Sequence, residues 1–183
     1  MRIIADYHTH TIYSHGKGTI RENVEAAIKK GFKTIGICDH GPGHYLYGVK
    51  REKIYEMRKE VDRLNKEYKE IRILLGVEAN IIGFDGTIDV DEKIIDMLDI
   101  LLLGFHYGVL FKSAGDFLFM NVANPVSKLV PISRDRIIER NTKAIIKAIE
   151  RYPIDIITHP GDKVKLNTKK VAEAAYEKGV ALE

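Results

Sequence analysis

Residue types that bind metal ions follow five short apolar segments, and this recurrence is the strongest chemical signal in the sequence. The segments are Arg2–Tyr7, Thr34–Cys38, Ile71–Val77, Ile100–Leu103 and Ile154–Thr158. The residues that follow or end them are His8, His10, Asp39, His40, Glu78, His106 and His159. Because a buried, unpaired histidine is costly, this repeated placement predicts a shared site. If the segments are parallel strands, the side chains open onto one rim of the sheet.

The spacing of the first histidines suits one cation. Side chains two positions apart on a strand share a face, so His8 and His10 could both reach the same ion. His15 follows in a turn-like segment just after this strand. At the end of the second segment, His40 could bind metal, while Asp39 could hold an imidazole nitrogen in place.

Glu78 is the only acid between Arg72 and Ala79, and it ends the third apolar segment. A carboxylate among imidazoles can bridge two cations, which no neutral ligand does as well. The seventh histidine, His44, lies in the loop Gly41–Gly48, where it could face substrate or solvent, and we expect solvent.

The elements that must position these residues alternate between strand and helix patterns. Helices are predicted after the capping box Thr19–Glu22, over Ile54–Tyr68, over Asp91–Met97, after Ser133 and over Thr168–Lys178. A sixth strand is predicted to begin at Val180. Short apolar strands separated by helices indicate an α/β fold with a parallel sheet, either a barrel or an open doubly wound sheet. Ligands at five strand ends favour the barrel. Tyr107–Pro131 is expected to be irregular, either a packed loop or a lid.

Length and composition bound the function. The 183 residues suit one domain, with 45% hydrophobic and 30% charged residues. A net charge of +3 gives no argument for nucleic acid as a partner. The sequence shows neither a signal peptide nor an apolar run of membrane-spanning length, so we expect a soluble, cytoplasmic protein. Cys38 is the single cysteine, which excludes an internal disulfide.

At the metal-ligand residues the chain resembles the PHP superfamily, named for polymerase and histidinol phosphatase. The matching segments are Asp6–Thr11, Ser14-His15, Cys38–His40, Gly76–Asn80, Gly104–His106 and Thr158–Gly161. Their order and spacing agree from residue 6 to the end of the chain. Among the subgroups, the chain looks most like the stand-alone bacterial PHP hydrolases.

The resemblance implies a distorted seven-stranded β/α barrel with a trinuclear centre of zinc, manganese or iron. It implies three ligand sets: His8, His10 and Glu78 for the first ion, Glu78, His106 and His159 for the second, and His15 and His40 for the third. We therefore expect up to three divalent metal ions. Imidazole and carboxylate ligands suit all three metals, so the sequence leaves the metal open.

The sequence departs from the family at its end. The family closes its centre with an Asp-x-His motif on a last strand, whereas this sequence stops within the sixth strand. We therefore expect residues 1–183 to form a single, C-terminally incomplete PHP domain that lacks the last strand. Truncation is the favoured explanation, and a second chain that supplies the missing parts is the alternative. The unclosed edge could also pair two copies as a homo-oligomer.

The predicted function is that of a metal-dependent phosphoesterase. It would hydrolyse a phosphate monoester or related small-molecule phosphoester with a metal-activated water at a multinuclear centre. The alternative is a catalytically impaired or non-catalytic metal-binding remnant that acts through assembly or regulation. A third hypothesis, 3′–5′ exonuclease action, is disfavoured by the weak basic balance and the absence of an attached domain. The sequence does not identify the phosphoester.

Overall fold

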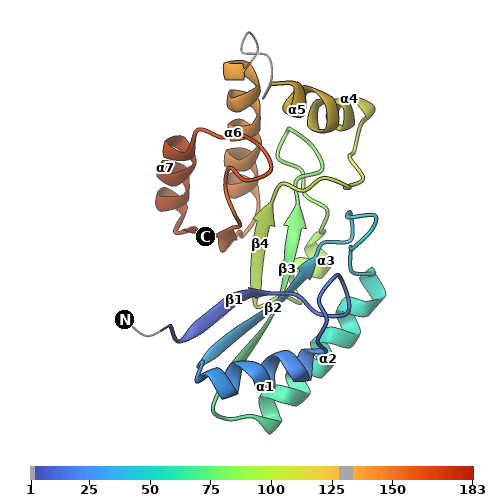
Figure 1. Ribbon diagram of the computed structural model, residues 1–183, viewed down its shortest axis with the longest axis vertical. Coiled ribbons are helices and arrows are strands. Elements are labelled where there is room, and N and C mark those ends of the chain that lie inside the picture. The colour runs from blue at the N-terminus through green and yellow to red at the C-terminus, as the bar shows by residue number, and fades with distance from the viewer. Residues whose placement is uncertain (1–2, 128–133) are drawn as a thin grey trace. The chain divides into compact units, whose positions relative to one another are not determined.

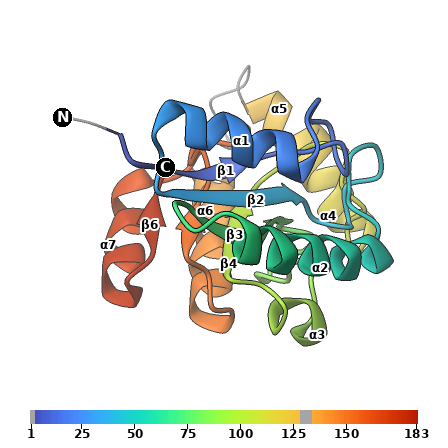
Figure 2. The ribbon, with the colours of Figure 1, turned by 90° about the horizontal axis from the view of Figure 1, so that it is seen from below.

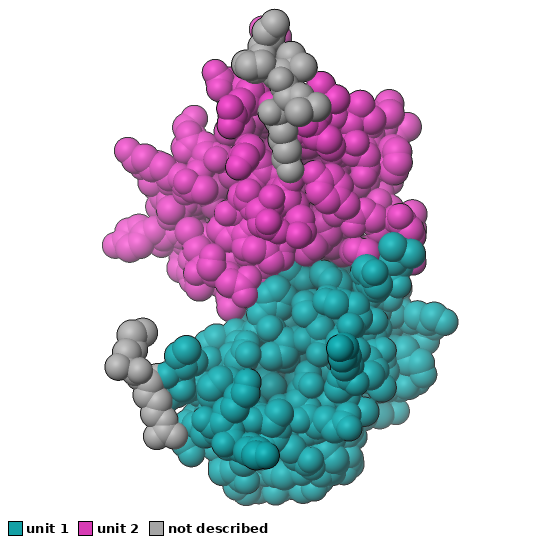
Figure 3. Space-filling model, in the orientation of Figure 1, with its two compact units in different colours: residues 1–42, 46–78, 90–101 teal, residues 43–45, 79–89, 102–183 magenta. Residues whose placement is uncertain are grey.

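The computed structural model describes residues 3–127 and 134–183, and the chain forms two compact units (Figure 3). Unit 1 comprises Met1–Pro42, Leu46–Glu78 and Val90–Leu101, and unit 2 comprises Gly43–Tyr45, Ala79–Asp89 and Leu102–Glu183. The strands follow the order β1-β2-β3-β4-β5-β6 in one sheet. The pairs β1–β2, β2–β3, β4–β5 and β5–β6 are parallel, so the predicted parallel α/β fold is confirmed.

Unit 1 contains the first strands and the helices beside them (Figure 1). Its elements are β1 (Ala5–Thr9), α1 (Ile20–Lys30), β2 (Thr34–His40), α2 (Arg51–Glu67), most of β3 (Arg72–Asn80), α3 (Glu92–Ile95) and the start of β4 (Ile100–Gly104). Helix α1 packs against both α2 and β2.

Local sequence signals explain where the helices of unit 1 begin and what they bury. The capping box holds the start of α1, because the Thr19 side chain accepts from Glu22 N and the Glu22 side chain accepts from Thr19 N. Gly31, in the left-handed conformation at φ 80°, ends this helix. In α2 the buried residues recur at helical spacing. They are Ile54, Met57, Val61 and Leu64.

Unit 2 contains the ends of β3 and β4 and the remaining elements. These are α4 (Ala114–Leu118), the π-helix η1 (Phe119–Ala123), α5 (Asn124–Ser127), α6 (Arg134–Arg151), β5 (Ile156–Ile157), α7 (Thr168–Lys178) and β6 (Ala181–Leu182). Helices α6 and α7 pack together, and Figure 2 shows them side by side. The buried face of α6 includes Ala144, Ile145 and Ala148.

Several predicted boundaries differ from the structure. His40 ends β2, as expected, whereas β3 continues two residues past Glu78, which therefore lies inside the strand. Strand β5 has only two residues. The expected irregular stretch is wrong over residues 114–127, which form α4, η1 and α5, because the Ser113 hydroxyl accepts from Asp116 N and starts a helix. The predicted cap Ser133, like residues 128–131, lies outside the described residues.

Among residues 3–127 and 134–183, there is no helix whose length and hydropathy would suit a membrane span.

Candidate metal centre

Five of the predicted ligands gather in unit 1, and we refer to them as the unit 1 cluster. The cluster consists of His8, His10, His15, His40 and Glu78. His8 lies in β1 and His10 directly after it, while His15 lies in the following loop. His40 ends β2 and is the register partner of Glu78 in β3. Parallel pairing of neighbouring strands thus brings residues far apart in sequence to one place.

One carboxylate oxygen is the focus of this cluster. Oxygen Oε2 of Glu78 lies 2.9 Å from His40 Nδ1, 3.3 Å from His8 Nε2 and 3.7 Å from His10 Nε2. The Glu78 residue is 0% exposed. A buried carboxylate ringed by imidazole nitrogens is a ligand set that a divalent cation can occupy.

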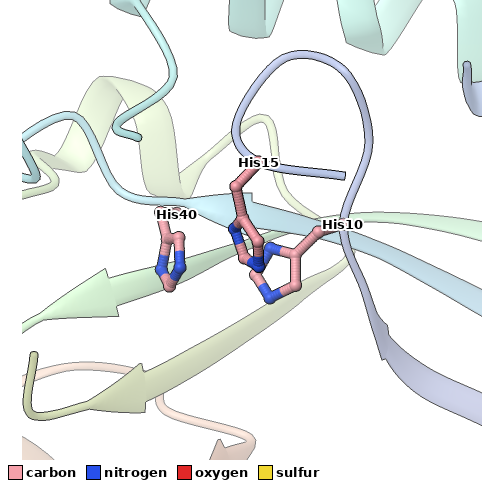
Figure 4. Close-up of side chains that lie close together, drawn as sticks. All are labelled: His10, His15 and His40. Carbon is pink, nitrogen blue, oxygen red and sulfur yellow. The ribbon is translucent and has the colours of Figure 1, made fainter. Parts of the chain in front are cut away.

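The imidazoles also approach one another. The Nε2 atoms of His8 and His10 are 3.1 Å apart. Figure 4 shows the rings of His10, His15 and His40 gathered beside the loop that follows β1. Their centroids are 4.5 Å apart for His10–His15, 4.7 Å for His10–His40 and 5.0 Å for His15–His40.

Two ligand groups in the cluster satisfy the spacing of a metal site. In each group, one ligand atom per residue lies within 4.8 Å of the others. The groups are His10, His15 and His40, and His8, His10 and Glu78.

The electrostatics of the cluster favour neutral imidazoles. Burial, followed by the nearby His40, lowers the pKa of His10 to about 3. The same two causes, in the same order, lower the pKa of His15. A metal ion binds the neutral ring, so His10 is already in the ligating form at neutral pH. The buried carboxylate of Glu78 is the one acidic group in this cluster, and its negative charge would be balanced by a bound cation.

A buried carboxylate fixes the loop that carries His10 and His15. Asp39, 0% exposed, accepts from Thr11 N at 2.7 Å, from Thr11 Oγ1 at 2.6 Å and from Ser14 Oγ at 2.5 Å. His10 Nδ1 is 4.0 Å from Asp39 Oδ1. Asp39 thus hydrogen-bonds Thr11 and Ser14, and it acts on the imidazoles mainly through the loop.

The remaining two predicted ligands, His106 and His159, lie in unit 2, with ring centroids 5.2 Å apart. Gly104 makes room for both. A Cβ atom there would lie 2.9 Å from His106 Cε1 and 3.3 Å from His159 Cε1. His159 has φ 33°, a conformation that side chains rarely adopt, and such strain concentrates at functional sites.

The expectation for His44 is wrong. The residue is 8% exposed, and its ring centroid lies 6.4 Å from that of His106 in unit 2. Its backbone forms a bridge with Val109, which holds the Gly41–Gly48 loop against the protein and takes the imidazole out of solvent. No pattern in the sequence indicates that Val109 pairs with this loop, so the burial of His44 could not be foreseen.

Two further polar residues of unit 2 escaped the sequence analysis. Asn80 and Asp89 are 0% and 7% exposed, and Asn80 Oδ1 lies 2.7 Å from His106 Nδ1. Their signal was present in the sequence, because Asp89 stands between Ile88 and Val90 and Asn80 follows an apolar strand.

Comparisons with known proteins identify the family of this chain. The family model described as PHP domain matches residues 6–178. A probable phosphatase of Caldanaerobacter subterraneus is 35% identical over 189 aligned residues, which cover 100% of this chain and 62% of the relative. A probable phosphatase of Proteus mirabilis is 36% identical over 180 residues, which cover 97% of this chain and 62% of the relative. The chain thus spans about three fifths of the length of these relatives.

A solved structure shares the fold. Histidinol phosphate phosphatase of Lactococcus lactis, in complex with zinc, L-histidinol and phosphate, superposes with a TM-score of 0.60. The match covers 98% of this chain and 72% of that protein, at 15% sequence identity.

Proposed function

Because this chain belongs to the PHP domain family, we propose that it is a metal-dependent phosphoesterase that hydrolyses a small-molecule phosphate monoester. The observation that carries the proposal is the environment of Glu78. Nitrogen atoms of His40, His8 and His10 lie within 3.7 Å of one oxygen of this buried carboxylate. The names of the relatives support a phosphatase and give no support to a non-catalytic remnant.

The proposed metal ligands are the seven residues of the sequence analysis. They are His8, His10, His15, His40, Glu78, His106 and His159. For the unit 1 cluster, the support is the ligand spacing of its two groups. For His106 and His159, the support is their family motifs and the space that Gly104 leaves beside both rings.

Zinc, manganese or iron at such a multinuclear centre would lower the pKa of a water nucleophile and offset charge on the phosphoryl oxygens. The chain's own contribution is to hold the ligands in a fixed arrangement. Neutral His10 and His15 each have one ring nitrogen with a lone pair for a cation, and Glu78 adds the negative charge that would retain it. Asp39 braces the loop of His10 and His15 through Thr11 and Ser14.

The ligands of the solved structure supply a compound to test. The Lactococcus protein carries L-histidinol and phosphate. L-histidinol phosphate is therefore the first specific compound to assay here, beside a generic aryl phosphate. A seventh strand that closes the barrel, pairing of two copies at a sheet edge and a cytoplasmic location stay predictions.

The test measures metal content and phosphate release in the same preparation. The purified chain is loaded with zinc or manganese, assayed with both compounds, and compared with Glu78→Gln. We expect retained metal and metal-dependent release of phosphate, both strongly reduced in the variant. A wild-type chain that retains no divalent ion under replete conditions, or that retains it without any turnover, would overturn the proposal.

A further inference from the structure

A buried polar network lies behind His106 in unit 2. It links Asp89 to the amide of Asn80 and that amide to the imidazole, through residues that are 7%, 0% and 6% exposed. The proposed function uses His106 as a ligand and assigns no role to the other two. Buried polar groups that satisfy one another in series fix a geometry, because any change leaves one of them without its partner.

The first link holds Asp89 in place. Asn80 N donates to Asp89 Oδ1 at 2.8 Å, and Gly43 N donates to Asp89 Oδ2 at 2.8 Å. Asp89 N donates in turn to Asn80 O at 3.2 Å. A Cβ atom at residue 43 would lie 2.8 Å from Asp89 Cβ, so this close approach requires glycine.

The second link fixes the orientation of the Asn80 amide. Its Nδ2 donates to Asp89 Oδ2 at 2.5 Å. A flipped amide would bring Oδ1 against the carboxylate oxygen, which places two acceptors together. Burial raises the pKa of Asp89 against the effect of these hydrogen bonds. Ionised Asp89 has acceptors only, so the amide must turn Nδ2 toward it, and the backbone N–H groups of Asn80 and Gly43 favour that ionised form.

The third link acts on His106. With Nδ2 turned toward Asp89, Oδ1 faces His106 Nδ1 at 2.7 Å. A carbonyl oxygen only accepts, so Nδ1 must carry the proton. In a neutral imidazole the lone pair then resides on Nε2, which is the arrangement that a metal ligand requires.

We propose that Asn80 and Asp89 are positioning residues that fix the tautomer and ring orientation of His106, so that Nε2 is presented as a metal ligand. This inference rests on the proposed function for the identity of the ligand. The hydrogen-bond chain itself does not depend on a bound ion. Asn80 and Asp89 act through His106, and neither is a catalytic residue.

The test begins with the metal-free wild-type protein. Nitrogen-15 spectra, with the His106 signal assigned by comparison with His106→Gln, report which ring nitrogen carries the proton. We expect the proton on Nδ1. A proton on Nε2 overturns the proposal, and this measurement needs no variant of the network.

The variant Asn80→Leu removes the acceptor at similar volume, and Asp85→Asn is the matched control. Asp85 is an exposed residue in the same loop as Asp89, and its side chain contacts Lys112 and Thr87. In Asn80→Leu we expect the Nε2-protonated form to appear and zinc affinity, measured by titration calorimetry, to fall about 10- to 100-fold. The control should retain the wild-type tautomer and affinity.

An unchanged tautomer together with unchanged zinc affinity in a folded Asn80→Leu chain would refute the assignment. The two proposals fail separately. A wild-type chain that binds no divalent ion defeats the proposed function, whereas the tautomer of its metal-free form still decides the role of Asn80.

Discussion

His40 and Glu78 are partners in the parallel register of β2 and β3, and His40 Nδ1 lies 2.9 Å from Glu78 Oε2. The two residues are adjacent because β2 and β3 pair in parallel along their length. Nearly forty residues of sequence separate them, and helix α2 lies in that interval. Rigid neighbouring strands hold ligands more precisely than loops do, so this pair is the fixed reference for the other imidazoles.

Glu78→Gln should remove most of the bound divalent ion while leaving the fold intact. The substitution keeps the shape and removes the charge that retains a cation. The metal-free variant should still unfold in one cooperative transition, because the side chain keeps its size and its place beside His40. Metal analysis and chemical denaturation with a chelator check both effects. Glu177→Gln, at an exposed position in α7, is the control and should change neither.

Thr11→Val should loosen the loop that carries His10 and His15. It removes a hydroxyl that donates to the buried carboxylate of Asp39 at 2.6 Å. Loss of one donor to a buried carboxylate costs about 1–3 kcal/mol, which thermal unfolding would measure. Thr11→Ser keeps the hydroxyl and should retain most of the stability. Equal destabilisation by both substitutions would contradict a specific role for the hydroxyl.

The metal-free protein should lose stability as the pH falls below the ordinary histidine value of 6.5 toward about 3. Burial and the neighbouring His40 lower the pKa of His10 to about 3 in the folded state. Between these values the unfolded chain takes up a proton that folded His10 does not, so acid favours unfolding. Above the ordinary value of 6.5, His10 is unprotonated in both the folded and the unfolded chain, so its contribution to the free energy of unfolding does not change with pH.

Urea midpoints of the chelated protein, measured from about pH 7 to about pH 4, would show this slope. In His10→Gln the urea midpoint should depend less steeply on pH. Some pH dependence should remain in this variant, because the pKa of His15 is also lowered. Identical slopes for the two chains would contradict the prediction.

Gly104→Ala should disturb His106 and His159 together. The added Cβ would lie 2.5 Å from Thr158 Oγ1 and 2.9 Å from His106 Cε1. Overpacking of this kind costs about 1–3 kcal/mol, and we expect weaker metal binding in addition. Gly115→Ala in α4 is the control, since the nearest atom to its Cβ is 3.7 Å away. A Gly104→Ala chain with wild-type stability would mean that the two imidazoles can move aside freely.

Much of the fold could be predicted because local signals agree with the tertiary structure. The capping box at Thr19 starts α1, and the predicted helix Thr168–Lys178 has the observed bounds of α7. The parallel order of the strands follows from their alternation with helices. The ends of the strands were harder to predict, since β2 and β3 continue beyond their apolar segments to the polar residues His40 and Asn80.

What the sequence could not supply were contacts between distant segments. The gathering of the unit 1 cluster was foreseeable from the strand-end pattern, whereas ligation by its members stays a proposal. The burial of His44 depends on a bridge to Val109, more than sixty positions away. The role of Asp89 depends on its approach to Asn80 and Gly43. Such pairings carry no periodicity, so composition and spacing do not reveal them.

The left-handed backbone of His159 sets stability and chemistry against each other at one position. Strain of this kind costs about 1–3 kcal/mol, and a glycine would relieve part of it while deleting the imidazole. Engineering this chain for heat resistance alone would therefore select the loss of a candidate ligand. A stabilised version meant to keep its chemistry should leave position 159 unaltered and seek its gains elsewhere.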